Sequence, residues 1–259
     1  MIVTGVVMKM PPSSGNWNVV PRGSLEQRSN YVKMMLMATK AKRAERRTDA
    51  LSRERIVTAA IEVLDAGGES ALTFRELAAR LATGSGAIYW HVASKNELLT
   101  AATDDVIARV MTGMVSSAEP QEVIRAIALG VFDAIDAHPW VGTQLSREPW
   151  QATVLQILEG VGGQLQALGV PDRAQFDCAS ALVNYILGLA GQYAAAARLL
   201  PRETDRSAFL ATIAARWAQL DPAKYPFVHQ VATQLPGHDD RGQFLAGIDL
   251  ILVGITTIR

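Results

Sequence analysis

Apolar positions recur at helical spacing along most of the chain. The first stretch repeats at steps of three and four residues, with charged residues between, at Ile56, Ala59, Ala60, Val63 and Leu64. This period of about 3.6 residues predicts an amphipathic helix that buries one face. No stretch alternates apolar and polar residues convincingly, so no sheet is expected. The pattern predicts an all-α protein.

Capping signals mark where the early helices begin. Ser52 precedes the first periodic stretch, and the glycine pair Gly67–Gly68 ends it. Thr73 opens "TFRELAARL" with a glutamate three residues later, and Ser94 opens "SKNELL" in the same way. In this spacing the hydroxyl and the carboxylate satisfy unpaired backbone N–H groups at a helix start. Residues 84–91 are therefore expected to form a brief third helix between two well-marked ones.

The rest of the chain predicts helix after helix, separated by prolines. The helix that Ser94 caps should run to about Ser116, and further helices are expected at 121–137, 150–168, 172–199, 204–220 and 241–258. We expect three parts: a basic arm over residues 1–48, a three-helix domain over 49–100 and a larger helical domain over 101–259.

Charge is unevenly distributed, although the net charge of the 259 residues is zero. Residues 1–55 hold 11 Lys and Arg against 4 Asp and Glu, whereas residues 56–259 hold 14 against 21. Most of the excess lies in "KAKRAERR", residues 40–47. A basic arm on an acidic body is either a solvated, disordered tail or a segment that meets an anionic partner, nucleic acid being the commonest.

The first 33 residues show no periodic apolar face. "VPRGS", residues 20–24, is similar to the thrombin-cleavage linkers used in protein expression, and Met34, Met35 and Met37 offer plausible native starts. The segment also lacks the apolar stretch and cleavage site of a secretory signal. Whether residues 1–33 are native stays open, and they do not enter the fold prediction.

Several classes of function are disfavoured. One cysteine, Cys178, excludes an internal disulfide framework and fits a reducing cytosol. No apolar run reaches the roughly 18 to 20 residues of a membrane-spanning helix. The four histidines do not stand at metal-ligand spacing, "HDD" at 238–240 suits a solvated turn, and "GVGG" at 160–163 lacks the rest of a phosphate loop. We expect a cytoplasmic protein without catalysis, cofactor or metal.

The most specific signal is "GAIYWHVASKNELL", residues 86–99, where Tyr, Trp and His adjoin and a Lys follows four residues on. Together with "RERIVTAAIEVLDAGG" and "LTFRELAARL" before it, this segment resembles the DNA-binding domain of the tetracycline-repressor (TetR) family. The resemblance implies a helix-turn-helix, in which the second helix braces and the third lies in the major groove of DNA.

The resemblance also implies roles for single residues. Tyr89, Trp90 and His91 look like clamps on the phosphate backbone, as does Lys95 in the first turn of the next helix. Arg75 is the best candidate for a contact to a base edge, with guanine its natural partner. Tyr89 or Trp90 also suits a half-buried prop for the third helix. The candidate DNA-binding set is Thr73, Arg75, Ser85, Gly86, Ala87, Tyr89, Trp90, His91 and Lys95.

The turn departs from the family pattern, which usually has Leu-Gly-Val-Ser where this chain has "LATG", residues 81–84. Ala82 stands where positive φ is favoured, a strain on the order of 1 kcal/mol, and Gly84 replaces the capping serine at a modest loss. The third helix then opens with "SGA" at 85–87, whose short side chains reach few base edges. We expect indirect readout and the basic arm to carry more of the specificity than usual.

Residues 101–259 resemble the family's regulatory domain more weakly, through "RGQFLAGIDLILVGI" at 241–255. By analogy this helix and 172–199 pair with their copies in a homodimer. Two recognition helices then lie roughly 34 Å apart on a near-palindromic double-stranded operator. A cavity between the helices would hold a small-molecule effector, by default hydrophobic or aromatic. Its candidate lining, which equally suits core or dimer contacts, is Trp140, Gln144, Trp150, Asn184, Tyr185 and Gln192.

The resemblance thus implies a transcriptional repressor that binds an operator as a homodimer and is released by a ligand. A transcriptional activator and an architectural DNA-binding protein are the alternatives. An enzyme is disfavoured because no nucleophile stands beside a base in a recognisable context.

Overall fold

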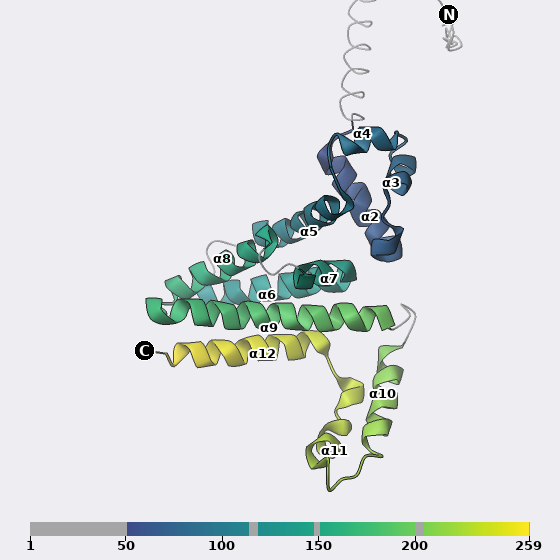
Figure 1. Cartoon of the computed structure of the whole chain (residues 1–259). Coiled ribbons are helices and arrows are strands. Elements are labelled where there is room, and N and C mark those ends of the chain that lie inside the picture. Colours follow the sequence, from purple (N-terminus) through teal and green to yellow (C-terminus); the bar gives the residue numbers. More distant parts are fainter. Residues whose placement is uncertain (1–50, 114–118, 148–150, 200–204, 259) are drawn as a thin grey trace, which may run out of the picture. The chain divides into compact units, whose positions relative to one another are not determined.

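A computed structural model describes residues 51–113, 119–147, 151–199 and 205–258 (Figure 1). In this part of the chain every regular element is a helix and no strand occurs, so the all-α prediction is confirmed. The expected basic arm of residues 1–48, with its "VPRGS" sequence, lies outside the described residues.

The first four helices begin within one residue of their predicted starts. They are α2 (Arg53–Ala71), α3 (Phe74–Arg80), α4 (Ser85–Tyr89) and α5 (Lys95–Thr112). Ser52 caps α2 as expected, because its Oγ accepts a hydrogen bond from the backbone N–H of Arg55 at 3.2 Å. The sequence prediction carried α5 further, to about Ser116, but residues 114–118 lie outside the described residues.

A kink at Gly68 breaks α2 near its end. Gly68 has φ +68° and ψ −170°, a conformation that a residue with a Cβ adopts only under strain. The regular helix therefore ends where the glycine pair predicted. One further turn, through Glu69 to Ala71, continues at a new angle and leads to α3.

The remaining helices form the larger part of the fold. They are α6 (Pro120–Ala137), α7 (Pro139–Arg147), α8 (Ala152–Ala167), α9 (Asp172–Leu199), α10 (Arg206–Trp217), α11 (Pro226–Ala232), the 3-10 turn η1 (Leu235–Gly237) and α12 (Asp240–Thr256). The bounds of α9 match the prediction, and those of α6, α8, α10 and α12 lie within about three residues of it.

Two helices, α7 and α11, were not predicted. Each begins with a proline, Pro139 or Pro226, and the sequence interpretation took Pro139 as a separator between helices. Proline suits the first turn of a helix because its missing N–H has no partner there and its φ is already helical. Only His138 stands between the end of α6 and the start of α7, which left no visible gap in the pattern.

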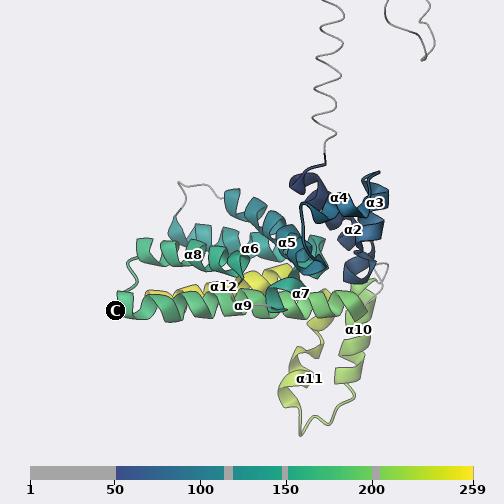
Figure 2. The same ribbon diagram turned by 45° about the horizontal axis from the view of Figure 1, so that its top comes forward.

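The helices are arranged around α5, α6 and α9. α2, α3 and α4 gather at the Lys95 end of α5, whereas α12 runs beside α9, and α10 and α11 extend away from them (Figures 1 and 2). Gly247 allows the close approach of α12 to α9, since a Cβ there would overlap the hydroxyl and the ring of Tyr185. The aromatic ring of Tyr185 stacks beside that of Phe244, with centroids 5.7 Å apart.

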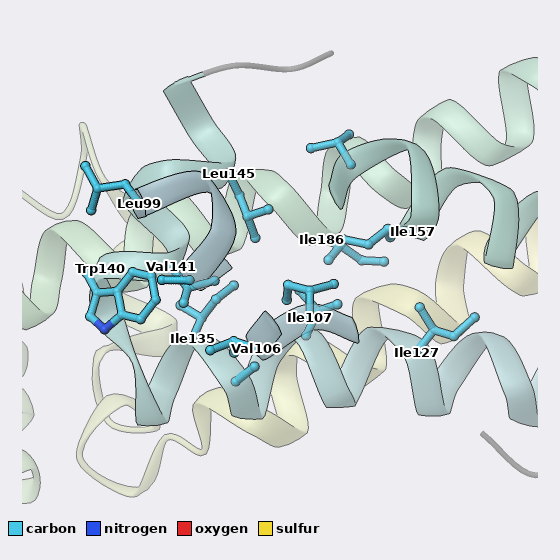
Figure 3. Packing of buried hydrophobic residues seen from close by; sticks show 14 of the residues in the cluster. Leu99, Val106, Ile107, Ile127, Ile135, Trp140, Val141, Leu145, Ile157 and Ile186 are labelled. Atoms are coloured by element: carbon cyan, nitrogen blue, oxygen red, sulfur yellow. The ribbon is translucent and has the colours of Figure 1, made fainter. Parts of the chain in front are cut away.

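Buried apolar side chains from α2 through α9 and from α12 form one contiguous cluster. Figure 3 shows part of it, where α5, α6, α7, α8 and α9 meet through Ile107, Ile127, Val141, Ile157 and Ile186. All five of these side chains have essentially no exposed surface. α5 therefore contributes to a core that it shares with α2 on one side and with the later helices on the other.

Candidate nucleic-acid interface

α3 and α4 meet at a tight turn that fixes the geometry of a helix-turn-helix. Leu77 of α3 and Ile88 of α4 are fully buried, and they belong to the same apolar cluster as the buried side chains of α2 and α5. In the turn, Ala82 has φ +50°, which confirms the expected positive φ. The backbone N–H of Thr83 donates to the carbonyl of Ala78 at 2.9 Å and closes α3. The chain thus tolerates an alanine where a glycine would be unstrained.

Capping side chains fix the starts of α3 and α5. Thr73 Oγ1 accepts from the Glu76 N–H at 3.1 Å, and Ser94 Oγ accepts from the Glu97 N–H at 3.1 Å. The Glu97 carboxylate in turn accepts from the backbone N–H of Ala93 at 2.8 Å. The reciprocal bond is thus made to the residue before the N-cap Ser94, not to Ser94 itself. Gly84 is the N-cap residue of α4, and no side chain caps this helix.

Tyr89 and Trp90 lie exposed at the end of α4. Tyr89 is 54% exposed while one face of its ring stacks on Phe74 of α3, with centroids 4.3 Å apart. Tyr89 therefore props α4 while about half of its surface stays open to solvent. Trp90 is 88% exposed, and an indole with so little buried surface contributes little to the core. The neighbouring His91 is partly buried.

The other candidate contacts lie on the same group of helices. Thr73 and Arg75 are exposed at the start of α3, and Ser85 and Gly86 are exposed at the start of α4, with Ala87 partly buried behind them. A Cβ built on Gly86 would meet nothing within 4 Å. The short side chains at the start of α4 therefore let a partner approach its backbone closely, as the sequence predicts.

Lys95 makes a contact that the sequence did not predict. Its ammonium Nζ donates to the backbone carbonyl of Glu69, on the last turn of α2, at 2.6 Å. The side chain is partly buried. An ammonium has three donors, so this bond fixes where the charge lies and leaves two donors for a further partner.

The candidate effector residues lie in three different places. Trp140 and Gln144 of α7 are buried against α2, where they donate to Asp65 at 2.8 Å and Glu69 at 3.4 Å. Tyr185 of α9 is partly buried, and its hydroxyl donates to the carbonyl of Phe244 at 3.3 Å. Two further members, Asn184 and Gln192, are exposed on α9, and Trp150 lies outside the described residues.

Polar contacts between α2 and α7 were missed by the sequence interpretation. Asp65 Oδ1 accepts from Trp140 and also lies 2.7 Å from Nδ1 of His138. The Glu69 carboxylate pairs with Arg147. These partners stand 73 to 78 positions apart in the chain, and no local spacing signals a contact between them.

Two further findings concern the described ranges alone. Within them, no group of three or more His, Cys, Asp or Glu side chains could hold a metal ion. No helix there is both long and apolar enough to cross a membrane.

Comparison with known proteins agrees with this geometry. Residues 56–102 match the model of bacterial regulatory proteins of the tetR family, and residues 118–259 match the tetracyclin repressor-like C-terminal domain. The chain belongs to the TetR family. It is therefore a transcriptional regulator with a helix-turn-helix, and the family is not one of enzymes.

Single relatives support the assignment. A TetR regulator from Streptomyces coelicolor has a solved structure that is 53% identical, with a TM-score of 0.73, and covers 81% of this chain and 99% of that one. The HTH-type transcriptional repressor DrrR1 of Streptomyces coeruleorubidus is 26% identical over 80% of this chain and 78% of its own length. An HTH-type regulator from Saccharopolyspora erythraea is 31% identical, but the match spans only 53% of this chain and 59% of that protein.

Proposed function

We propose that this TetR regulator is a cytoplasmic repressor that binds a near-palindromic double-stranded operator as a homodimer and leaves it when a small molecule binds. The observation that carries the DNA-binding part is the exposure of Trp90, 88% at the end of α4. The adjoining Tyr89 is also 54% exposed, and large aromatic side chains that lie together in water are typical of a surface that meets a partner. The repressor DrrR1, similar over most of its length, supports repression rather than activation.

Nine residues form the proposed contact surface with DNA. Hydroxyl, indole and ammonium groups at the end of α4 and the start of α5 suit phosphate oxygens, and Arg75 suits a base edge. The short residues at the start of α4 allow close approach to the groove. The set is Thr73, Arg75, Ser85, Gly86, Ala87, Tyr89, Trp90, His91 and Lys95.

Exposed residues on α9 and α12 support a homodimer. Leu250 is 75% and Val253 is 64% exposed on α12, one turn apart. On the adjacent α9, Asn184 and Gly188 are exposed, and a Cβ on Gly188 would meet nothing within 4 Å. Apolar side chains beside small ones let two copies of a helix pair approach closely, and a dimer places one recognition helix on each half-site.

The match to a tetracyclin repressor-like C-terminal domain supports an effector site in residues 101–259. Hydrophobic or aromatic small molecules are the ligand class that helical pockets of this kind favour. The proposed lining is Trp140, Gln144, Trp150, Asn184, Tyr185 and Gln192. In a homodimer, each copy contributes one helix-turn-helix, which we call a DNA-binding head. The effector would bind more tightly to dimers whose two heads are not spaced to fit the operator. Its binding would therefore reduce the fraction of dimers that can bind DNA.

The proposed function is tested by titrating labelled fragments of the chain's own upstream promoter region with purified protein, at two salt concentrations, and following fluorescence anisotropy. Tight binding to one near-palindromic fragment, weaker at higher salt, is the expected result. Equal binding to every fragment would contradict operator recognition and favour the architectural alternative.

A further inference from the structure

Glu69 has two sets of partners that belong to different parts of the molecule. Through its backbone carbonyl it accepts a hydrogen bond from the ammonium of Lys95, the first residue of α5. Through its carboxylate it pairs with Arg147, the last residue of α7. One residue of α2 therefore contacts both a candidate phosphate ligand and a helix of the larger helical domain.

The carboxylate contact with α7 is bidentate. The two terminal nitrogens of Arg147 lie 2.9 Å from Oε2 and 3.1 Å from Oε1 of Glu69. The amide nitrogen of Gln144, one turn earlier on α7, donates to Oε2 at 3.4 Å. A planar guanidinium that binds both carboxylate oxygens fixes the orientation of the side chain as well as its distance. The Glu69 side chain is 29% exposed, so water screens this pair only in part.

The backbone carbonyl is aimed by the kink that precedes it. With φ +68°, Gly68 ends the regular helix, and the carbonyl of Glu69 accepts from both the Leu72 N–H at 3.3 Å and Lys95 Nζ at 2.6 Å. Since the side chain and the carbonyl of Glu69 share one Cα, a displacement of α7 that pulls on the carboxylate also changes where the carbonyl holds the ammonium.

We propose that Glu69 is a positioning residue that couples the position of α7 to the phosphate-binding position of the Lys95 ammonium. The proposal rests on the proposed function, because it needs Lys95 to meet a DNA phosphate. With Glu69 held by Arg147, the ammonium stays at the start of α5, where it reaches the backbone of bound DNA. When α7 shifts, Glu69 moves with it, and the Lys95 ammonium is no longer held in the position that binds phosphate.

The measurement that isolates this role is the salt dependence of DNA binding. Each phosphate that a protein neutralises contributes about 0.9 to the slope of log affinity against log salt. Lys95→Met should therefore lower the slope by about 0.9 per head, or about 1.8 in a homodimer. If Glu69 positions the ammonium, Glu69→Gln should lower the slope toward the Lys95→Met value, and the double variant should match Lys95→Met alone.

The matched control for Glu69→Gln is Glu62→Gln. Glu62 also lies on α2 and pairs with an arginine, Arg80, at 2.8 Å, but this pair joins α2 to α3 and does not involve α7. Both substitutions remove one negative charge at a similar place, so their long-range effect on DNA is alike. Glu62→Gln should keep the wild-type slope.

A second variant removes the α7 side of the Glu69–Arg147 contact. Arg147→Gln leaves Glu69 in place and should lower the slope as Glu69→Gln does. Its control is Arg241→Gln, which breaks the exposed Arg241–Asp133 pair at 2.9 Å between α12 and α6. Circular dichroism at each salt concentration establishes that every variant is folded.

Three outcomes overturn the proposal. In the first, Glu69→Gln and Arg147→Gln both show the same salt slope as their control variants. In the second, Lys95→Met keeps the wild-type slope. In the third, the slope of the Glu69→Gln/Lys95→Met double variant falls by the sum of the two single decreases. Each leaves operator recognition by the wild-type protein untouched. A wild-type protein that prefers no promoter fragment would instead contradict the proposed function.

Discussion

The ring of Tyr89 stacks on the ring of Phe74, with the two planes inclined by 12°. Phe74 is the first residue of α3 and Tyr89 the last of α4, so the stack joins the outer ends of the two helices of the helix-turn-helix. Trp90, the next residue, makes no comparable stack among the ring contacts of the described residues. The two adjacent aromatic side chains therefore have different consequences when they are removed.

Trp90→Ala should weaken DNA binding without weakening the fold. The indole is 88% exposed, so its loss should change the free energy of unfolding by no more than about 0.5 kcal/mol. Loss of a hydrogen bond from the indole to a charged phosphate costs about 1.5 kcal/mol or more, roughly tenfold in affinity for each head. Anisotropy titration and urea unfolding measure the two effects.

Phe227→Ala is the control for Trp90→Ala. Phe227 is 70% exposed on α11, away from α3 and α4. It should change neither the unfolding free energy nor the affinity for DNA. If Trp90→Ala binds DNA as tightly as Phe227→Ala does, Trp90 does not contact the operator.

Arg75→Ala should relax the sequence preference of binding. Its side chain is exposed at the start of α3, and a bidentate contact to guanine discriminates against other bases by about 1 to 3 kcal/mol. Affinity for the preferred operator should fall by that amount, while affinity for a scrambled duplex should change little. Competition between the two duplexes measures the ratio, and an unchanged ratio would show that the base contact lies elsewhere.

Ala82→Gly should stabilise the protein. Ala82 has φ +50°, a conformation that costs an alanine roughly 1 to 2 kcal/mol and a glycine almost nothing. The greater entropy of glycine in the unfolded chain offsets part of the gain, which leaves about 0.5 to 1 kcal/mol. Urea unfolding of the variant gives this difference directly.

Ala79→Gly provides the opposite case within the same helix-turn-helix. Ala79 is exposed inside α3, where glycine should destabilise by about 1 kcal/mol. Equal unfolding free energies for Ala82→Gly and the wild type would mean that the turn relaxes around Ala82 and stores no strain.

Leu250→Asp should separate the homodimer. Leu250 is 75% exposed on α12, so a carboxylate there is solvated in the monomer but would be buried without a partner in a paired interface. Sedimentation at fixed protein concentration should change from a dimer to a monomer, and operator affinity should fall with it. Leu155→Asp on α8, at a side chain 50% exposed, should leave the dimer intact, and dissociation by both substitutions equally would rule out the α12 face as the interface.

The helix-turn-helix could be predicted from the sequence because its signals are local. A cap and the apolar period lie within one helix, so Ser52, Thr73 and Ser94 each marked a helix start correctly. The positive φ of Ala82 was expected from the family resemblance, because the family usually has a glycine at that position. The exposure of Trp90 could not be predicted, because the sequence also suited a half-buried prop.

The larger helical domain was less predictable because its contacts are between distant segments. A single residue separates α7 from α6, and the sequence gives no sign that residues of α7 pack on α2. Trp140 and Gln144 have the chemistry of a ligand pocket, yet their polar atoms donate to Asp65 and Glu69. The residue type predicts which groups a side chain can bind, whereas the fold determines which of those groups lie within hydrogen-bond distance.

The contiguous core has a consequence for how this protein can change. Because α2 through α9 and α12 share one buried cluster, heat or denaturant should melt the DNA-binding and larger helical parts in a single cooperative transition. The exposed positions Arg75, Ser85, Gly86 and Trp90 lie outside that cluster. Exchanging them alters the surface offered to DNA at little cost in stability, so a new operator preference can be acquired while the rest of the molecule stays as it is.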